Sequence, residues 1–140
     1  MTLLVLDTNV LSEVMRGRHM DAGVRAWLGT LTATPVTTVV NRAEILAGIA
    51  LLPPGHRRET LRTAAAQALD GLGVCLPLTD GAAEHYADIV ATRRALGRPV
   101  GGLDALIAAI VRQVDGRLAT RDTADFDGLG LTLVDPWQAT

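Results

Sequence analysis

The sequence predicts an α/β fold in which a central parallel sheet of about five strands carries helices on both faces. Short aliphatic runs of strand length alternate along the chain with longer segments whose apolar residues recur every three or four positions. The run at 3–6 is apolar throughout, as expected of a strand covered on both faces. The segment at 103–114 is apolar nearly all round, as expected of a buried helix. Strands separated by helices favour parallel pairing.

Each expected strand is a short apolar run that ends at polar or turn-forming residues. The strands are expected at 3–6, 35–38, 74–76, 118–120 and 131–134. The helices are expected at 10–17, 21–31, 39–52, 56–72, 79–96 and 103–114, with Thr8 or Asn9 as the cap of the first. Trp27 lies in an apolar stripe and is interpreted as a core or interface residue, and Cys75 as an unreactive core thiol.

We expect one domain that spans residues 1–140. A chain of 140 residues is long enough for one hydrophobic core and too short for two. No apolar run reaches the length of a membrane span, and the N-terminus lacks the charged flank of a signal peptide. The single cysteine cannot form an internal disulfide, so we expect a cytoplasmic protein without membrane contact.

All thirteen basic residues are arginine, in a chain whose net charge is −2. The lack of lysine excludes a standard phosphate-binding P-loop and Schiff-base catalysis, because both require a lysine amine. Ser12 and Cys75 have no histidine nearby in the sequence, so acyl transfer through a protein nucleophile has no support. His19, His56 and His85 lack the spacing of metal ligands.

Four acidic residues stand where a parallel sheet gathers functional groups. Asp7 follows the first strand, Asp122 follows the fourth, Glu44 lies in the helix after the second strand, and Asp104 lies in the first turn of the most buried helix. The carboxyl ends of parallel strands and the helix starts after them meet at one edge. We therefore expect these four carboxylates to converge.

Four converging anions require a cation. At about 6 Å and an effective dielectric constant near 20, each pair of charges repels by about 3 kcal/mol. Ligands that are all oxygen favour Mg²⁺ or Mn²⁺ over zinc. Structural alternatives remain open at this stage: Asp122 could cap the turn that follows it, Asp104 its own helix, and Glu44 could pair with Arg42 or Arg121.

Several segments together resemble one known family. They are LDTNVLSE at 6–13, RAEILAGI at 42–49, GRPV at 97–100 with DALIAA at 104–109, LATRDTADF at 118–126 and DPW at 135–137. In this order, and in a chain of this length, they resemble the PIN-domain ribonucleases that act as VapC toxins, in the FitB-like branch. The resemblance covers nearly the whole chain.

The resemblance implies that Asp7, Glu44, Asp104 and Asp122 form a catalytic Mg²⁺ site, with Asp7 and Asp104 as the most direct ligands. Many relatives carry asparagine in place of Asp122, so this position is expected to tune the site. It further implies supporting roles for a nearby acid and three polar residues that orient ligands or phosphate, namely Asp125, Thr8, Asn9 and Thr120.

The implied activity is Mg²⁺-dependent (or Mn²⁺-dependent) hydrolysis of RNA by a metal-activated water, as the toxin of a type II toxin–antitoxin pair. Arg93, Arg94 and Arg98 are expected to hold phosphates, unless they simply form a solvated helix end. The implied partners are a VapB-type antitoxin and a second copy of the chain, in a heterotetramer or larger complex, with the face around Trp27 as one candidate surface.

Two other function classes remain to be weighed. The first is a catalytically weak PIN-like binding module that acts through its antitoxin or an RNA partner. The second is a phosphatase of the haloacid dehalogenase type. That class requires Asp-x-Asp after the first strand and a lysine, whereas this chain has Asn9 at the second position and no lysine.

Overall fold

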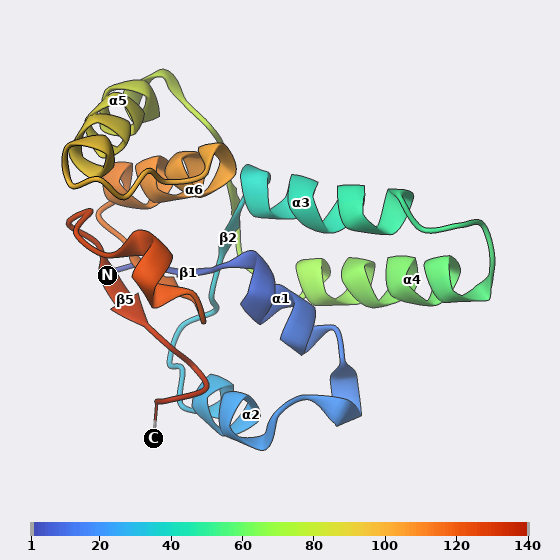
Figure 1. Ribbon diagram of the computed structural model, residues 1–140. Coiled ribbons are helices and arrows are strands. Elements are labelled where there is room, and N and C mark those ends of the chain that lie inside the picture. Colours follow the sequence, from blue (N-terminus) through green and yellow to red (C-terminus); the bar gives the residue numbers. More distant parts are fainter. Residues whose placement is uncertain (1, 140) are drawn as a thin grey trace.

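Short parallel strands, in a three-stranded and a two-stranded sheet, form the centre of the molecule (Figure 1). The computed structural model describes residues 2–139. The paired strands are β1 (Leu4–Leu6) with β4 (Arg117–Ala119), β4 with β5 (Thr132–Val134), and β2 (Thr37–Thr38) with β3 (Cys75–Leu76). A bridge between Val5 and Val36 joins the two groups, and the Leu6 N–H donates to the Val36 carbonyl at 2.8 Å. The predicted α/β class and all five strand positions are confirmed.

Within residues 2–139, six α-helices follow the predicted pattern. They are α1 (Thr8–Val14), α2 (Ala22–Gly29), α3 (Val39–Ala50), α4 (His56–Asp70), α5 (Asp80–Ala95) and α6 (Gly102–Gln113). Two short 3₁₀ helices, Gly17–His19 and Thr123–Phe126, were not predicted. The predicted cap of α1 was wrong, because the helix begins at Thr8 and Asp7 is its N-cap.

Strand β1, the middle strand, separates two clusters of buried apolar residues. Val5 belongs to a buried cluster built with α5 and α6, whereas Leu4 and Leu6 belong to a cluster built with α1, α3 and α4. Alternate residues of a strand point to opposite faces, so an entirely apolar strand needs cover on both. Figure 1 shows α5 and α6 on one side of the strands and α1 and α2 on the other, while α3 and α4 extend as an antiparallel pair.

The environment of three apolar residues refines the predictions. Cys75 is exposed, contrary to prediction, because it lies on edge strand β3, where only Leu76 faces the core. Leu103 is 51% exposed at the start of α6, although the helix is otherwise largely buried, as predicted. Trp27 is partly buried and packs against the core, in line with its interpretation as a core or interface residue.

No helix within residues 2–139 combines the length and apolar composition that a membrane span requires.

Arg93 has a structural environment that the sequence did not reveal. It is only 4% exposed, and its guanidinium donates to the backbone carbonyls of Arg98 at 2.7 Å, Asp125 at 2.6 Å and Asp127 at 3.2 Å. A buried guanidinium whose Nε and Nη1 already donate to three backbone carbonyls is not available to a phosphate group. The expected phosphate-binding role of Arg93 therefore does not fit its position, which joins α5 to the segment after β4.

Replacing Arg93 by methionine should destabilise the protein by about 3 kcal/mol, because three carbonyls lose a charged hydrogen-bond donor while most of the apolar volume is kept. The free energy of unfolding in urea measures this change. The matched control is Arg94→Met, one residue along the same helix and exposed, which should shift stability by about 0.5 kcal/mol or less. Equal effects of the two substitutions would contradict the structural role of Arg93.

Candidate metal-binding site

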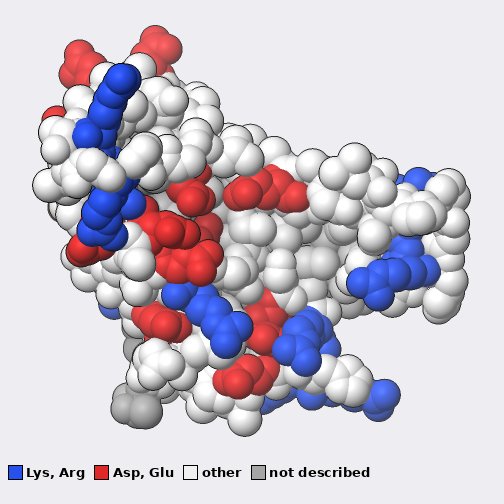
Figure 2. Space-filling view, in the orientation of Figure 1, with Lys and Arg blue, Asp and Glu red and all other residues white. Residues whose placement is uncertain are grey.

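All four carboxylates singled out in the sequence line one pocket. Asp7, Glu44, Asp104 and Asp122 surround a volume of about 420 Å³, together with Thr8, Asn9 and Ser12. Figure 2 shows acidic side chains gathered at the centre of this face of the molecule. Four separate segments of the chain therefore bring their carboxylate side chains into the same pocket.

The sheet topology explains this convergence. Asp7 directly follows β1 and Asp122 follows β4, the strand paired with β1, so both lie at the same edge of the sheet. Glu44 lies in α3, which begins directly after β2, and Asp104 lies in the first turn of α6. The carboxyl ends of parallel strands form a crevice in which open α/β sheets bind ligands.

Asp7 is the most buried of the four acids, with 5% of its surface exposed. Its carboxylate accepts hydrogen bonds from the Thr120 hydroxyl at 2.7 Å, the Thr8 backbone N–H at 2.9 Å and the Asn41 side-chain amide at 3.0 Å. Burial raises the pKa of Asp7 above its ordinary value, and these three donors oppose that shift. The donors therefore favour an anionic carboxylate in a site that is otherwise costly for charge.

Asp104 is affected by the other acids most clearly. Burial, followed by the charges of Asp7, Asp125, Glu44 and Asp122, raises the pKa of Asp104 to about 6. Burial and the neighbouring negative charges therefore both disfavour the ionised form of Asp104. Asp125 does not line the pocket, yet its charge acts on Asp104, and its supporting role stays a prediction.

The polar residues predicted to support the acids make direct contacts with them. The Thr8 hydroxyl donates to Oε1 of Glu44 at 2.8 Å, and the Asn9 amide donates to Oδ2 of Asp122 at 3.1 Å. Asn9 also donates to the hydroxyl of Thr120 at 3.3 Å. Among residues 2–139, Glu44 and Asp122 form no ion pair, and Asp104 is not the N-cap of α6. Asp122 does occupy the N-cap position of the 3₁₀ helix Thr123–Phe126, as one structural alternative proposed, but its side chain makes no capping hydrogen bond there and instead accepts one from Asn9.

Asn41 is a contributor that the sequence analysis missed. Its side chain is fully buried and donates to Oδ1 of Asp7 and to the Thr8 hydroxyl, both at 3.0 Å. An available signal was its position in α3, one turn before Glu44 and among the apolar residues of the buried face. A polar side chain at a core position needs hydrogen-bond partners, and here the partners are the site residues.

The donor chemistry fits a hydrated Mg²⁺ or Mn²⁺ ion. Across the described residues 2–139, no three histidine, cysteine, aspartate or glutamate side chains lie close enough together to enclose a metal ion. Mg²⁺ does not require such an enclosure, because it keeps several water ligands and is usually held by one or two carboxylates. An open pocket with four carboxylates suits such an ion better than it suits Zn²⁺, which prefers nitrogen and sulfur ligands in a closed tetrahedron.

The surroundings of the site include exposed arginines. Arg94 is exposed, and Arg98 donates to the Ala124 carbonyl at 3.1 Å and lies 3.5 Å from Asp127. The Arg121 guanidinium lies over the indole ring of Trp137, 4.7 Å from its centroid, and the Arg121 backbone N–H donates to Asn9. Figure 2 shows basic side chains next to the acidic patch, over α5 and the connection that follows it.

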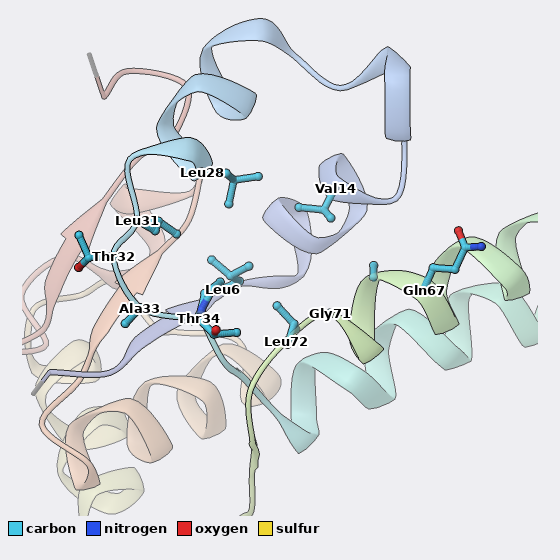
Figure 3. A pocket seen from close by; sticks show the side chains of 12 residues that line it. Leu6, Val14, Leu28, Leu31, Thr32, Ala33, Thr34, Gln67, Gly71 and Leu72 are labelled. Carbon is cyan, nitrogen blue, oxygen red and sulfur yellow. The ribbon is translucent and has the colours of Figure 1, made fainter.

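A larger groove of about 480 Å³ lies elsewhere, between α1, α2 and the end of α4 (Figure 3). Leu6, Val14, Leu28, Leu31 and Leu72 point toward it, and no charged side chain lines it. A cavity without titratable groups offers nothing for acid–base or metal chemistry. The acidic pocket is therefore the candidate for catalysis.

Residues 4–130 match the PIN domain family. The chain is 34% identical to the VapC ribonuclease Y4jK of Sinorhizobium fredii, over 97% of this chain and 99% of that protein. It is 33% identical to Toxin FitB of Neisseria gonorrhoeae, over 96% of this chain and 99% of that protein.

The fold agrees with these sequence relationships. The solved structure of FitAcB from Neisseria gonorrhoeae superimposes with a TM-score of 0.86 and 31% identity, covering 98% of this chain and 100% of that chain. The family match and these full-length similarities place the chain in the PIN domain family and, within it, among the VapC proteins, close to FitB.

Proposed function

We propose that this protein is a metal-dependent endoribonuclease that acts as the toxin of a type II toxin–antitoxin pair. The observation that carries the proposal is the convergence of Asp7, Glu44, Asp104 and Asp122 on one pocket. The similarity to a VapC ribonuclease supports RNA as the substrate class. The similarity to a protein named as a toxin supports the biological role.

Asp7 and Asp104 would hold the ion directly, and Glu44 and Asp122 would act on it through water or as further ligands. When bound, Mg²⁺ or Mn²⁺ supplies an activated water and neutralises charge on the phosphodiester under attack. The chain's own contribution is to keep the carboxylates ionised and oriented. The hydroxyl of Thr120 and the amide of Asn9 do so for Asp7 and Asp122.

RNA must approach an acidic pocket, so nearby cations are needed to hold its phosphates. Arg94 and Arg98 remain proposed phosphate-binding residues, and we add Arg121. Stacking on Trp137 leaves the N–H groups at the edge of the Arg121 guanidinium free to bind a phosphate in a bidentate manner. Asn9, which lines the pocket, contacts both Asp122 and the Arg121 backbone N–H, so the backbone of this arginine lies next to the pocket.

The proposed partners are a VapB-type antitoxin and a second copy of the chain, assembled as a heterotetramer or a larger complex in the cytoplasm, where the RNA substrate is found. The similarity to Toxin FitB and to the solved FitAcB structure supports the antitoxin partner. Residues 1–140 would act as one PIN domain, with the face around Trp27 as a candidate for the contact between copies.

Purified protein should cleave RNA only with Mg²⁺ or Mn²⁺ present. Asp7→Ala and Asp104→Asn should each lower the rate by about 100-fold or more, because a metal-bound site contributes several kcal/mol to transition-state stabilisation. Cleavage of a labelled RNA resolved on a gel measures this rate. Glu84→Gln, at an exposed carboxylate of α5, is the matched control and should retain full activity.

Undiminished cleavage by both site variants would refute the proposed site. Binding of RNA without any cleavage by the wild-type protein would instead favour the alternative of a binding module.

The metal-free protein should become less stable as the pH rises from about 4 to about 7. Asp104 has a pKa of about 6 when folded and 3.8 ordinarily, so the folded state binds its proton more tightly than the unfolded state does. That contribution to stability is complete below pH 3.8 and is lost as the pH rises through about 6. Asp104→Asn should reduce this pH dependence, which is measured from the melting temperature in EDTA. If the melting temperature of the variant changes with pH as steeply as that of the wild type, the raised pKa of Asp104 is wrong.

Arg121→Ala should raise KM for RNA by about 5- to 10-fold and leave kcat nearly unchanged, since a phosphate contact away from the reacting group contributes uniform binding. Steady-state cleavage kinetics separate the two parameters. The control is Arg62→Ala on α4, another exposed arginine, which should not change KM. If KM is the same in Arg121→Ala as in the wild type, Arg121 does not contact the substrate.

A further inference from the structure

We propose that Asn41 is a positioning residue that holds the carboxylates of Asp7 and Glu44 in the arrangement that binds a divalent cation, before the cation arrives. The inference rests on the proposed function, because it concerns the same pocket. It assigns a role to a residue that is neither acidic nor in contact with solvent. Its support is a chain of hydrogen bonds that passes through one buried amide.

The side chain of Asn41 lies where an apolar residue would otherwise be expected. Asn41 is fully buried, and its neighbours on the buried face of α3 are Val40, Ile45 and Ile49. A buried amide is unfavourable unless its donors and acceptor find partners. Asn41 satisfies them by accepting a hydrogen bond from the Thr38 hydroxyl at 2.7 Å, in addition to its two donor contacts with Asp7 and Thr8.

The chemistry of the partners fixes the direction of these bonds. An ionised carboxylate only accepts hydrogen bonds, so the NH₂ group of Asn41, and not its oxygen, must face Asp7. The same NH₂ group donates to the Thr8 hydroxyl oxygen, which leaves the proton of Thr8 free to point to Oε1 of Glu44, at 2.8 Å. One amide therefore orients two carboxylates, directly at Asp7 and through Thr8 at Glu44.

The hydrogen bonds made by Asn41 and Thr8 counteract the electrostatic repulsion between the carboxylates of the site. Carboxylates that face one another without a cation repel, and their side chains can rotate apart into solvent. Hydrogen-bond donors behind the ligands hold them in place, and the ordering of the ligands is then largely complete before the ion binds. Loss of Asn41 would remove one donor from Asp7 and free the Thr8 hydroxyl to turn away from Glu44.

A purely structural role for Asn41 is the competing explanation, because Asn41 also joins the start of α3 to the end of β1. Thr37 offers a matched control for that role. It is 2% exposed, lies on β2 just before α3, and its hydroxyl donates to the Leu6 carbonyl of β1 at 2.9 Å. Thr37→Val removes a buried hydrogen bond between the same elements and touches no carboxylate.

The experiment measures binding of Mg²⁺ alone, and then of Mn²⁺ alone, by isothermal titration calorimetry without RNA. The proteins are the wild type, Asn41→Ala and Thr37→Val, and urea unfolding in EDTA gives the stability of each. Asn41→Ala should weaken the affinity for Mg²⁺ by about 10- to 100-fold, the usual effect of removing a residue that orients metal ligands. Thr37→Val should lose stability and keep the wild-type affinity.

A second measurement distinguishes weakened binding of the metal ion from a general disruption of the folded protein. RNA cleavage by Asn41→Ala should recover toward the wild-type kcat as the Mg²⁺ concentration is raised, because the defect lies in ion binding. If Asn41→Ala does not fold, Thr8→Val carries the test, since it cuts the link to Glu44 and leaves the contact between Asn41 and Asp7. It too should weaken Mg²⁺ binding.

Unchanged Mg²⁺ affinity in Asn41→Ala, or an equal loss of affinity in Thr37→Val, would overturn the inference. A wild-type protein that binds Mg²⁺ but cleaves no RNA would refute the proposed nuclease and leave the role of Asn41 intact. A wild-type protein that binds neither Mg²⁺ nor Mn²⁺ would refute both.

Discussion

Electrostatic repulsion among carboxylates at one edge of the sheet is the constraint on which the site depends. Parallel pairing of β1 with β4 brings Asp7 and Asp122 to the same edge, and α3 and α6 add Glu44 and Asp104. Burial, and after it the charges of the neighbouring acids, raises the pKa of Asp104 to about 6. A fold that concentrates negative charge in this way loses stability unless the charge serves a bound cation.

The chain limits the repulsion with neutral donors and not with basic residues. Thr120, Asn41 and the backbone of Thr8 donate to Asp7, while Thr8 and Asn9 donate through their side chains to Glu44 and Asp122. Such donors stabilise the anions and leave oxygen lone pairs free, whereas an arginine in the pocket would compete with a metal ion. The arginines lie instead around the pocket, where they suit a polyanionic substrate.

The acids could be predicted from the sequence because strand ends and helix starts are visible in it, and parallel topology then determines where they meet. The roles of Arg93 and Asn41 could not be predicted in this way. Both depend on which atoms of distant segments lie opposite a buried polar group, and neither hydrophobic periodicity nor spacing encodes this. The exposure of Cys75 was missed for a related reason: an apolar run does not reveal which strand lies at the edge of the sheet.

Crystals grown or soaked with Mn²⁺ offer the most direct test, because anomalous scattering locates the ion independently of any activity. The account predicts a manganese peak in the pocket of Asp7, Glu44, Asp104 and Asp122, in contact with Asp7 and Asp104 and completed by water. A peak elsewhere on the protein, or no peak at concentrations that support RNA cleavage, would contradict it.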